Sequence, residues 1–227
     1  MQSKEHWERV YTTKAADAVS WYQPHAEHSL ALIRATGTPR SGSIIDVGGG
    51  ASTLVDDLLA DGYTSLTVLD LSASALEAAQ HRLGRRAVSV AWLVGDVTTT
   101  RLPERAYDVW HDRAVFHFLT AEQDRRAYVA SVQRSVKPLG HVIVATFAED
   151  GPTQCSGLPV VRYSPEALHA QFGDSFALLK QEREAHHTPF GTVQKFIYCY
   201  CRLAQPGRAA VPDPGPGIPR HLERSGP

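Results

Sequence analysis

Three short apolar runs in this chain each lead into an acidic residue. The first run, residues 43–45, ends in Asp46 and passes through Gly48-Gly49-Gly50, while the later runs end at Asp70 and Asp96. A helical pattern follows each of the first two runs, which is typical of parallel strands joined by crossover helices. Because parallel strands end at one edge of their sheet, we expect the three carboxylates to lie at one ligand-binding crevice.

Alternating strand and helix patterns fill most of the chain. Ser164 and Pro165 predict the start of a late helix, because serine is a good N-cap and proline suits the first turn. After this helix the pattern changes to two strands close enough in sequence to form a hairpin. The strands are predicted at 43–47, 65–70, 88–94, 106–111, 139–147, 175–185 and 192–203, and the main helices at 51–61, 73–84 and 121–136. The fold class is therefore α/β, a doubly wound parallel sheet closed by an antiparallel pair.

The two ends of the chain differ from this core. Residues 3–36 show amphipathic helical patterns, and Pro24 is predicted to begin the second of these helices. Prolines and glycines dominate the chain beyond Leu203, which predicts disorder. We therefore expect an N-terminal helical lid or cap at 1–40, one binding domain at 41–203, and a disordered tail at 204–227.

Composition excludes several classes of protein. The 227 residues carry a net charge of -1, so there is no broad electrostatic reason to bind nucleic acid or an anionic membrane. The three cysteines lack metal-ligand spacing and are too few for a disulfide framework. The polar N-terminus resembles no signal peptide, and no apolar run is long enough to span a bilayer. We expect a cytoplasmic protein with no metal, nucleic-acid or membrane partner.

The acidic residues favour a cationic nucleoside as the ligand. A dinucleotide-binding loop would have a third glycine where Thr53 stands, and Asp46 would repel a pyrophosphate but stabilise an ammonium or sulfonium. Asp70 can accept hydrogen bonds from ribose hydroxyls, and Asp96 can accept one from an adenine amino group beside the backbone N–H of Val97. The glycines could also serve only the turn, and Asp70 or Asp96 could be ordinary residues at strand ends.

These motifs together resemble the class I S-adenosylmethionine-dependent methyltransferases, over roughly residues 20–203. The matching segments are 45–50, 69–70, 95–97, 107–113 and 139–144. The resemblance implies a Rossmann-like, doubly wound seven-stranded sheet in the order 3-2-1-4-5-7-6, with strand 7 antiparallel. It also implies that S-adenosyl-L-methionine is bound by Trp21, Asp46, Gly48, Gly49, Gly50, Asp70, Leu71, Asp96, Val97 and Asp112.

The resemblance also suggests catalytic positions at the end of the fourth strand. Asp112 would face the methyl donor, although an ion pair with Arg113 is an alternative. His117 would approach the acceptor as a general base, although packing or an adenine contact is an alternative. The segment lacks the Asn/Asp-Pro-Pro-Tyr/Phe motif of enzymes that methylate adenine or glutamine amide nitrogens, so DNA methylation is not expected. His186-His187 lacks a nearby third ligand, so no metal site is predicted.

We expect an enzyme that methylates a small molecule, because residues 40–203 are spent on the core fold and leave no domain to recognise a macromolecule. A thiol or an amine is the expected acceptor, because neither requires a strong general base. A protein lysine N-methyltransferase is an alternative, since His6–Tyr11 resembles the opening of enzymes that act on thiols or protein lysines. A nicotinamide-dependent oxidoreductase and a non-catalytic donor-binding protein are further alternatives. The aromatic N-terminal arm is predicted to close over the donor as a lid.

Overall fold

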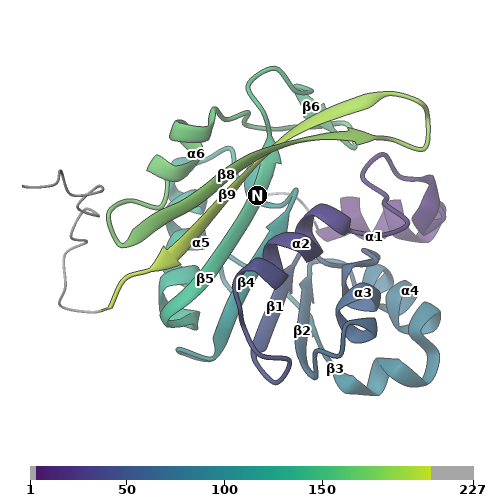
Figure 1. Ribbon diagram of the computed structural model, residues 1–227. Helices are drawn as coiled ribbons and strands as arrows, with labels where there is room; N and C mark the ends of the chain where they lie inside the picture. The colour runs from purple at the N-terminus through teal and green to yellow at the C-terminus, as the bar shows by residue number, and fades with distance from the viewer. Residues whose placement is uncertain (1–3, 206–227) are drawn as a thin grey trace, which may run out of the picture.

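A computed structural model describes residues 4–205 and shows helices packed on both faces of a mixed sheet (Figure 1). The strands follow the order β3-β2-β1-β4-β5-β9-β8, which confirms the predicted sheet order. Strand β9 runs antiparallel to both of its neighbours, as predicted for the last strand. The strands are β1 (Ser43–Val47), β2 (Ser65–Asp70), β3 (Val90–Val94), β4 (Tyr107–Arg113), β5 (Val136–Phe147), β8 (Phe176–His187) and β9 (Val193–Leu203).

Strand alternation divides the core into two layers. Neighbouring residues such as Ile44 and Ile45 pack into different clusters, because successive side chains of a strand point to opposite faces. The first cluster includes residues of α2, α3 and α4, and the second includes residues of α5 and α6. The helices are α1 (Lys4–Thr13), α2 (Glu27–Ala35), α3 (Leu54–Ala60), α4 (Ala73–Leu83), α5 (Glu122–Ser135) and α6 (Pro165–Ala170), with short 3₁₀ turns η1 (Ala16–Ala18), η2 (Gly84–Ser89) and η3 (Phe116–Phe118).

Pro24 does not begin a helix, contrary to prediction. Helix α2 begins at Glu27, and the backbone N–H of the preceding Ala26 donates to Asp57 at 2.9 Å. A carboxylate from α3 therefore fixes this helix start, so a tertiary contact overrides the local proline signal. Pro165 does occupy the first turn of α6, and Ser164 caps it through a 3.2 Å bond from the N–H of Ala167.

A small hairpin interrupts the loop after β5 and was not predicted. Strands β6 (Gln154–Cys155) and β7 (Leu158–Pro159) pair antiparallel through Ser156 and Gly157. Both turn residues have positive φ, 52° and 75°, which is typical of a two-residue turn whose twist matches a hairpin. The hairpin places Cys155 in a buried position.

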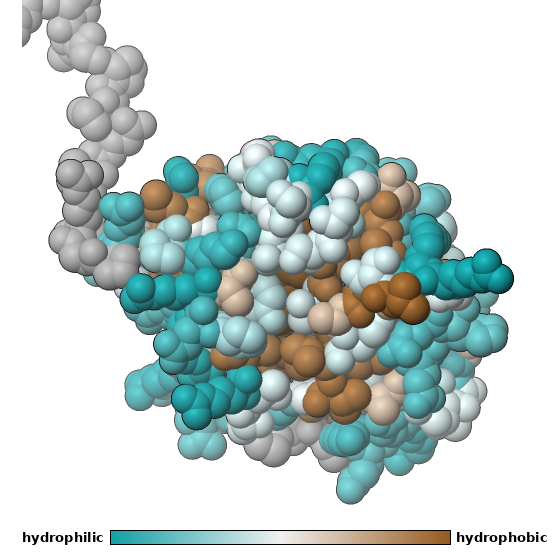
Figure 2. Space-filling view, turned by 90° about the horizontal axis from the view of Figure 1, so that it is seen from below, coloured by the Kyte–Doolittle hydropathy of each residue, from teal (hydrophilic) through white to brown (hydrophobic). Residues whose placement is uncertain are grey.

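The N-terminal segment lies at the edge of the sheet where the parallel strands end. Figure 1 shows α1 beyond the ends of β1 and β2, with the β8–β9 hairpin extending over the same region. Figure 2 looks onto the opposite side, where hydrophobic side chains gather in the middle of a hydrophilic surround. Within residues 4–205 no helix is both long and apolar enough to cross a membrane. The predicted disorder of the tail concerns residues that lie almost entirely outside this range.

Candidate active site

The glycine turn after β1 packs directly against two carboxylates. A Cβ on Gly49 would lie 2.4 Å from Oδ2 of Asp46, and a Cβ on Gly50 would lie 2.5 Å from Oδ2 of Asp70. Gly48 has φ +69°, a conformation that side chains rarely adopt. The turn therefore needs glycine for both backbone conformation and space.

Asp46 is held by a chain of buried hydrogen bonds. Its Oδ1 lies 2.7 Å from Nδ1 of His111 on β4, and Nε2 of His111 lies 2.9 Å from the hydroxyl of Ser29 on α2. All three side chains are almost completely buried. Because one carboxylate oxygen is occupied by His111, the orientation of the other oxygen toward the glycine turn is fixed.

Asp70 occupies the end of β2, with its Oδ1 accepting a 2.8 Å bond from the N–H of Ser72. Burial raises the pKa of Asp70 to about 7, and the nearby charges of Asp46 and Glu8 act in the same direction. Ser72 itself caps α4 through a 3.1 Å bond from the N–H of Ala75. Asp70 is thus a buried carboxylate next to the start of α4, and the residue that caps this helix is Ser72.

Two adjoining cavities lie over the ends of the strands. The larger, of about 920 Å³, is lined by six predicted donor-binding residues, which are Trp21, Gly48, Asp70, Leu71, Asp96 and Val97. The smaller, of about 550 Å³, is lined by Trp21, Asp46, Gly48 and Gly49. The cavities share Tyr11, Trp21, Gly48 and Arg113. Gly50 lines neither cavity, although the turn brings it against Asp70.

Aromatic side chains cover the larger cavity. The ring of Trp7 on α1 packs edge-on against Trp21 and Phe118, with centroid distances of 5.7 and 5.3 Å. The indole N–H of Trp21 donates to the hydroxyl of Tyr11 at 3.2 Å. The N-terminal segment therefore forms part of the cavity wall.

Glu8 fixes this cover to the rest of the molecule. Its carboxylate accepts bonds of 2.8 and 3.1 Å from the N–H groups of Ala73 and Ser74, and one of 3.0 Å from the hydroxyl of Ser72. Burial disfavours the charge of Glu8, but these bonds outweigh that effect and lower its pKa to about 2. A side chain from α1 thereby satisfies the exposed N–H groups at the start of α4.

We expect Glu8→Gln to lower the free energy of unfolding at pH 7 by about 1 kcal/mol, as loss of a helix cap does. The lowered pKa of Glu8 means that its contribution is full above the ordinary value of 4.5 and is lost as the pH falls toward 2. Urea unfolding at pH 7 and pH 4 should therefore show a smaller difference between variant and wild type at pH 4. Glu5→Gln, a surface change on the same helix, is the control. An equal difference at both pH values would contradict this role.

The structure places Asp112 and His117 outside both cavities. Asp112 accepts bonds from the hydroxyl of Tyr128 at 2.7 Å and from the N–H groups of Val115 and Phe116 at 2.9 and 3.1 Å. Burial raises the pKa of Asp112 to about 7. This carboxylate holds the turn after β4, and the alternative ion pair with Arg113 is not formed, because Arg113 pairs with Glu184 instead.

His117 is fully buried between aromatic rings. Its Nδ1 lies 3.3 Å from the N–H of Phe147, and its Nε2 has no hydrogen-bond partner. Burial lowers the pKa of His117 to about 3, and the charge of Arg113 contributes. This placement favours the packing alternative over a general base acting in the cavity.

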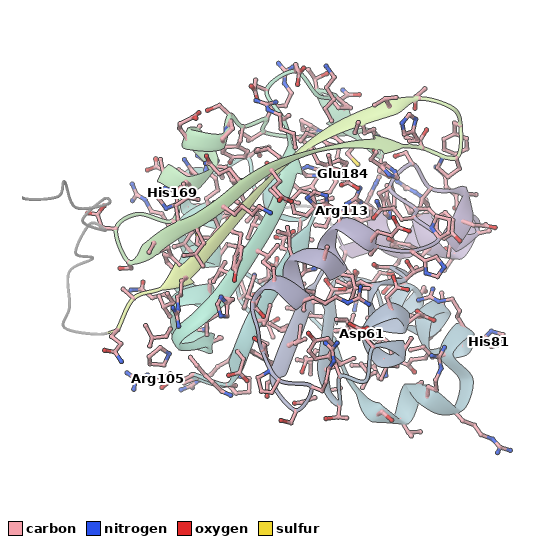
Figure 3. All side chains as sticks on the ribbon, in the orientation of Figure 1. Asp61, His81, Arg105, Arg113, His169 and Glu184 are labelled. Carbon is pink, nitrogen blue, oxygen red and sulfur yellow. The ribbon has the colours of Figure 1, made fainter. Side chains whose placement is uncertain are left out.

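Arg113 and Cys155 line the larger cavity and were not predicted as site residues. Figure 3 shows Arg113 next to Glu184, beneath the β8–β9 hairpin. Cys155 is buried, and burial raises the pKa of its thiol to about 12. The available signal for Arg113 was an arginine at the last position of a central strand, at the sheet edge where ligands bind.

His186, the first of the paired histidines in the closing hairpin, has a structural role. Nε2 of His186 lies 2.8 Å from the backbone oxygen of Ser20, and the side chain of Gln194 donates to the Ser20 hydroxyl at 3.3 Å. These bonds hold the segment that carries Trp21. Among residues 4–205 no cluster of three or more potential metal ligands is found.

Sequence comparisons place a methyltransferase domain at the centre of the chain. Residues 44–140 match a family model described as a methyltransferase domain. The chain is 24% identical to the EEF1A lysine methyltransferase 2 of Danio rerio, over 63% of this chain and 68% of that protein. It is also 24% identical to the eEF1A lysine and N-terminal methyltransferase of the same organism, covering 65% of this chain but only 22% of that longer protein.

Structural comparisons find the same fold. A protein studied for the conversion of a disulfide bond into a thioacetal group during echinomycin biosynthesis gives a TM-score of 0.71 at 18% identity, covering 88% of this chain and 92% of that one. The 1,6-didemethyltoxoflavin-N1-methyltransferase of Burkholderia thailandensis, with bound S-adenosylhomocysteine, gives 0.63 at 19% identity, covering 89% and 84%. Residues 44–140 therefore match a methyltransferase domain, and the chain shares its overall fold with the solved methyltransferase that holds S-adenosylhomocysteine.

Proposed function

We propose that the methyl donor, S-adenosylmethionine, binds across both cavities. Its nucleoside part fits the larger cavity, where Asp70 and Asp96 can accept bonds from ribose and adenine. Its methionyl part fits the smaller cavity, where Asp46 offers a negative charge near the ammonium group. The glycine turn supports this assignment, because no other residue leaves space between the two carboxylates.

The residues shared by the two cavities mark where the two parts of the donor would join. This junction would hold the sulfonium, the group that supplies the methyl for transfer. The aromatic rings of Tyr11 and Trp21 lie at the junction and can stabilise a cation through their faces. Arg113 is the remaining side chain there, since Gly48 has none.

We propose further that the acceptor is a small molecule with a thiol or amine nucleophile. The observation that carries this proposal is the aromatic cover over the larger cavity, which Glu8 fixes to the start of α4 and which narrows access for a large acceptor. The residues lining that cavity include no histidine, and Asp112 and His117 lie elsewhere. A nucleophile that needs little help from a general base suits such a site.

A protein lysine is the second candidate acceptor. It is favoured by the resemblance to proteins described as EEF1A lysine methyltransferases, which cover about two thirds of this chain. A lysine side chain is narrow enough to enter a walled cavity while the rest of its protein stays outside. The two candidates therefore differ in which class of molecule receives the methyl group, and that is measured directly.

Donor with a deuterated methyl group, incubated with the purified chain and a cell lysate, separates the two candidates. We expect the label in the low-mass fraction, with Asp70→Ala protein as the background control. Label found in protein lysines, with the low-mass fraction at background, would replace the small-molecule proposal with the lysine candidate.

A further inference from the structure

Arg113 is the one arginine or lysine among the residues that line the two cavities. It ends β4, and its side chain is only 9% exposed. A guanidinium cannot be deprotonated in a protein, so a permanent positive charge lies at the cavity junction. None of the roles described above uses that charge to bind the donor.

The guanidinium is held in a fixed orientation. Nε and Nη2 each lie 3.3 Å from Oε2 of Glu184, Nε also donates to the hydroxyl of Tyr198 at 3.1 Å, and Nη1 donates to the backbone oxygen of Trp21 at 3.3 Å. The group lies over the ring of Phe196, 4.2 Å from its centroid. These bonds are long, and they do not use all five N–H groups of the guanidinium.

Glu184 is itself held by neighbours. The side chain of Gln23 donates to its Oε1 at 2.7 Å, and the hydroxyl of Tyr198 donates to its Oε2 at 3.0 Å. Glu184 thus makes a buried cation tolerable from the hairpin side and fixes its plane. A positioned guanidinium with spare donors is the arrangement that proteins use to bind anions.

Glu184 already offsets the charge of Arg113 from the hairpin side, so what Arg113 offers to the cavity is its unused N–H groups. An anionic acceptor can accept a hydrogen bond from these groups and is also attracted by the positive sulfonium. We propose that the acceptor binds as a thiolate, with its sulfur accepting a hydrogen bond from Arg113 beside the sulfonium. This inference rests on the proposed function and narrows its acceptor from a thiol or an amine to a thiol.

The charge of Arg113 affects the pKa of one thiol of the protein, that of Cys155. The pKa of Cys155 is raised by burial to about 12, and the charge of Arg113 is the effect that opposes this rise. Cys155 therefore stays protonated and does not compete as a nucleophile. A thiol in direct contact with the guanidinium would be stabilised as thiolate more strongly. The other titratable groups around Arg113 are Glu184 and His186 of β8, Tyr198 of β9, and His117.

The transfer step balances without a protein base. The acceptor thiol loses its proton to solvent as it binds. The resulting thiolate sulfur forms a bond to the methyl carbon while the bond from that carbon to the sulfonium breaks, and its electron pair passes to the donor sulfur. The products are two neutral thioethers, one of them S-adenosylhomocysteine. Once both are neutral, neither pairs with Arg113, which favours their release.

Benzyl mercaptan and benzylamine are matched probes, because they differ only in the nucleophile. We expect the wild-type protein to methylate the thiol faster, with product measured by mass spectrometry. Arg113→Met should lower kcat/KM for the thiol by about tenfold or more, the loss of one charge-assisted hydrogen bond. It should also move the acidic limb of the pH–rate profile to higher pH, and Arg113→Lys should recover part of both losses. Arg126→Met, a change at an exposed arginine on α5, is the control.

Calorimetric titration with S-adenosylhomocysteine measures binding at the donor site separately from turnover of the acceptor. We expect Arg113→Met to lower kcat/KM for the thiol by a larger factor than it lowers affinity for S-adenosylhomocysteine, because Arg113 also donates to the backbone oxygen of Trp21. An unchanged acidic limb in Arg113→Met, a preference of the wild type for benzylamine, or turnover of neither probe overturns the thiolate inference. Label confined to protein lysines in the lysate experiment refutes the proposed function instead.

Discussion

Asp70→Ala is expected to weaken binding of S-adenosylhomocysteine by roughly 5- to 150-fold, or ~1–3 kcal/mol. The proposed ribose site depends on this one buried carboxylate at the end of β2. Its loss leaves two ribose hydroxyls without the buried carboxylate that accepts from them in the proposed complex. Isothermal titration calorimetry of wild type and variant measures the difference directly.

The raised pKa of Asp70 adds a pH signature to the same experiment. Only the ionised carboxylate accepts bonds from both hydroxyls, and in the free protein it becomes protonated as the pH falls through about 7. Wild-type affinity should therefore fall below pH 7, while the affinity of Asp70→Ala should not follow this titration.

Asp108→Ala is the matched control for Asp70→Ala. Asp108 also accepts a backbone bond, from Ser43 at 2.8 Å, but it stands at the start of β4, at the opposite edge of the sheet. Its loss should reduce stability without changing donor affinity. Equal affinities of wild type and Asp70→Ala would remove the ribose assignment.

The sheet order and the donor edge were accessible from the sequence because their signals are local. Short apolar runs define β1 and β2 with the predicted bounds, and the glycine turn follows β1 directly. Parallel strands joined by helices then place Asp46 and Asp70 at the same edge without any knowledge of side-chain contacts. By contrast, these local signals do not say toward which face of the sheet a side chain at a strand end points.

Strand alternation explains why the catalytic predictions at β4 and the observed cavity differ. His111 and Arg113 are two residues apart, so they share a face of the sheet, while Asp112 points to the other. Register pairs Asp46 with His111 and Val47 with Asp112, which places Asp46 and His111 on one face. The alternation of side chains along a strand is predictable from the sequence, but Asp112 was predicted as a site residue from the family resemblance.

The N-terminal cover depends on contacts that no local pattern encodes. Glu8 bonds to Ala73 and Ser74, which lie 65 and 66 residues away in the sequence. Segment 20–23 is held by Glu184, His186 and Gln194 from the closing hairpin. Sequence indicated aromatic residues on an otherwise polar arm, but not which helix or strand would hold them in place.

Gly49→Ala is expected to cost at least about tenfold in affinity for S-adenosylhomocysteine, because it removes the fixed geometry of Asp46. The new Cβ would lie 2.4 Å from Oδ2 of Asp46 and 2.8 Å from Cγ1 of Val68, a core residue that is 1% exposed. The carboxylate is the only neighbour that can turn away, and turning breaks its 2.7 Å bond to His111. A hydrogen bond to a charged group contributes ~1.5–3 kcal/mol, so unfolding should require less urea as well.

Gly62→Ala separates this steric effect from backbone strain. Gly62 has φ +89° and no atom within 4 Å of its Cβ position, so alanine there introduces strain without a collision. We expect Gly62→Ala to lower stability by ~1 kcal/mol and to leave donor affinity unchanged. Gly49→Ala should lower both, because Asp46 links the β1 turn to His111 and to the proposed methionyl site. Equal affinity of Gly49→Ala and wild type for S-adenosylhomocysteine would mean that the turn moves to accept the new Cβ. Donor binding would then depend neither on the observed position of Asp46 nor on glycine at position 49.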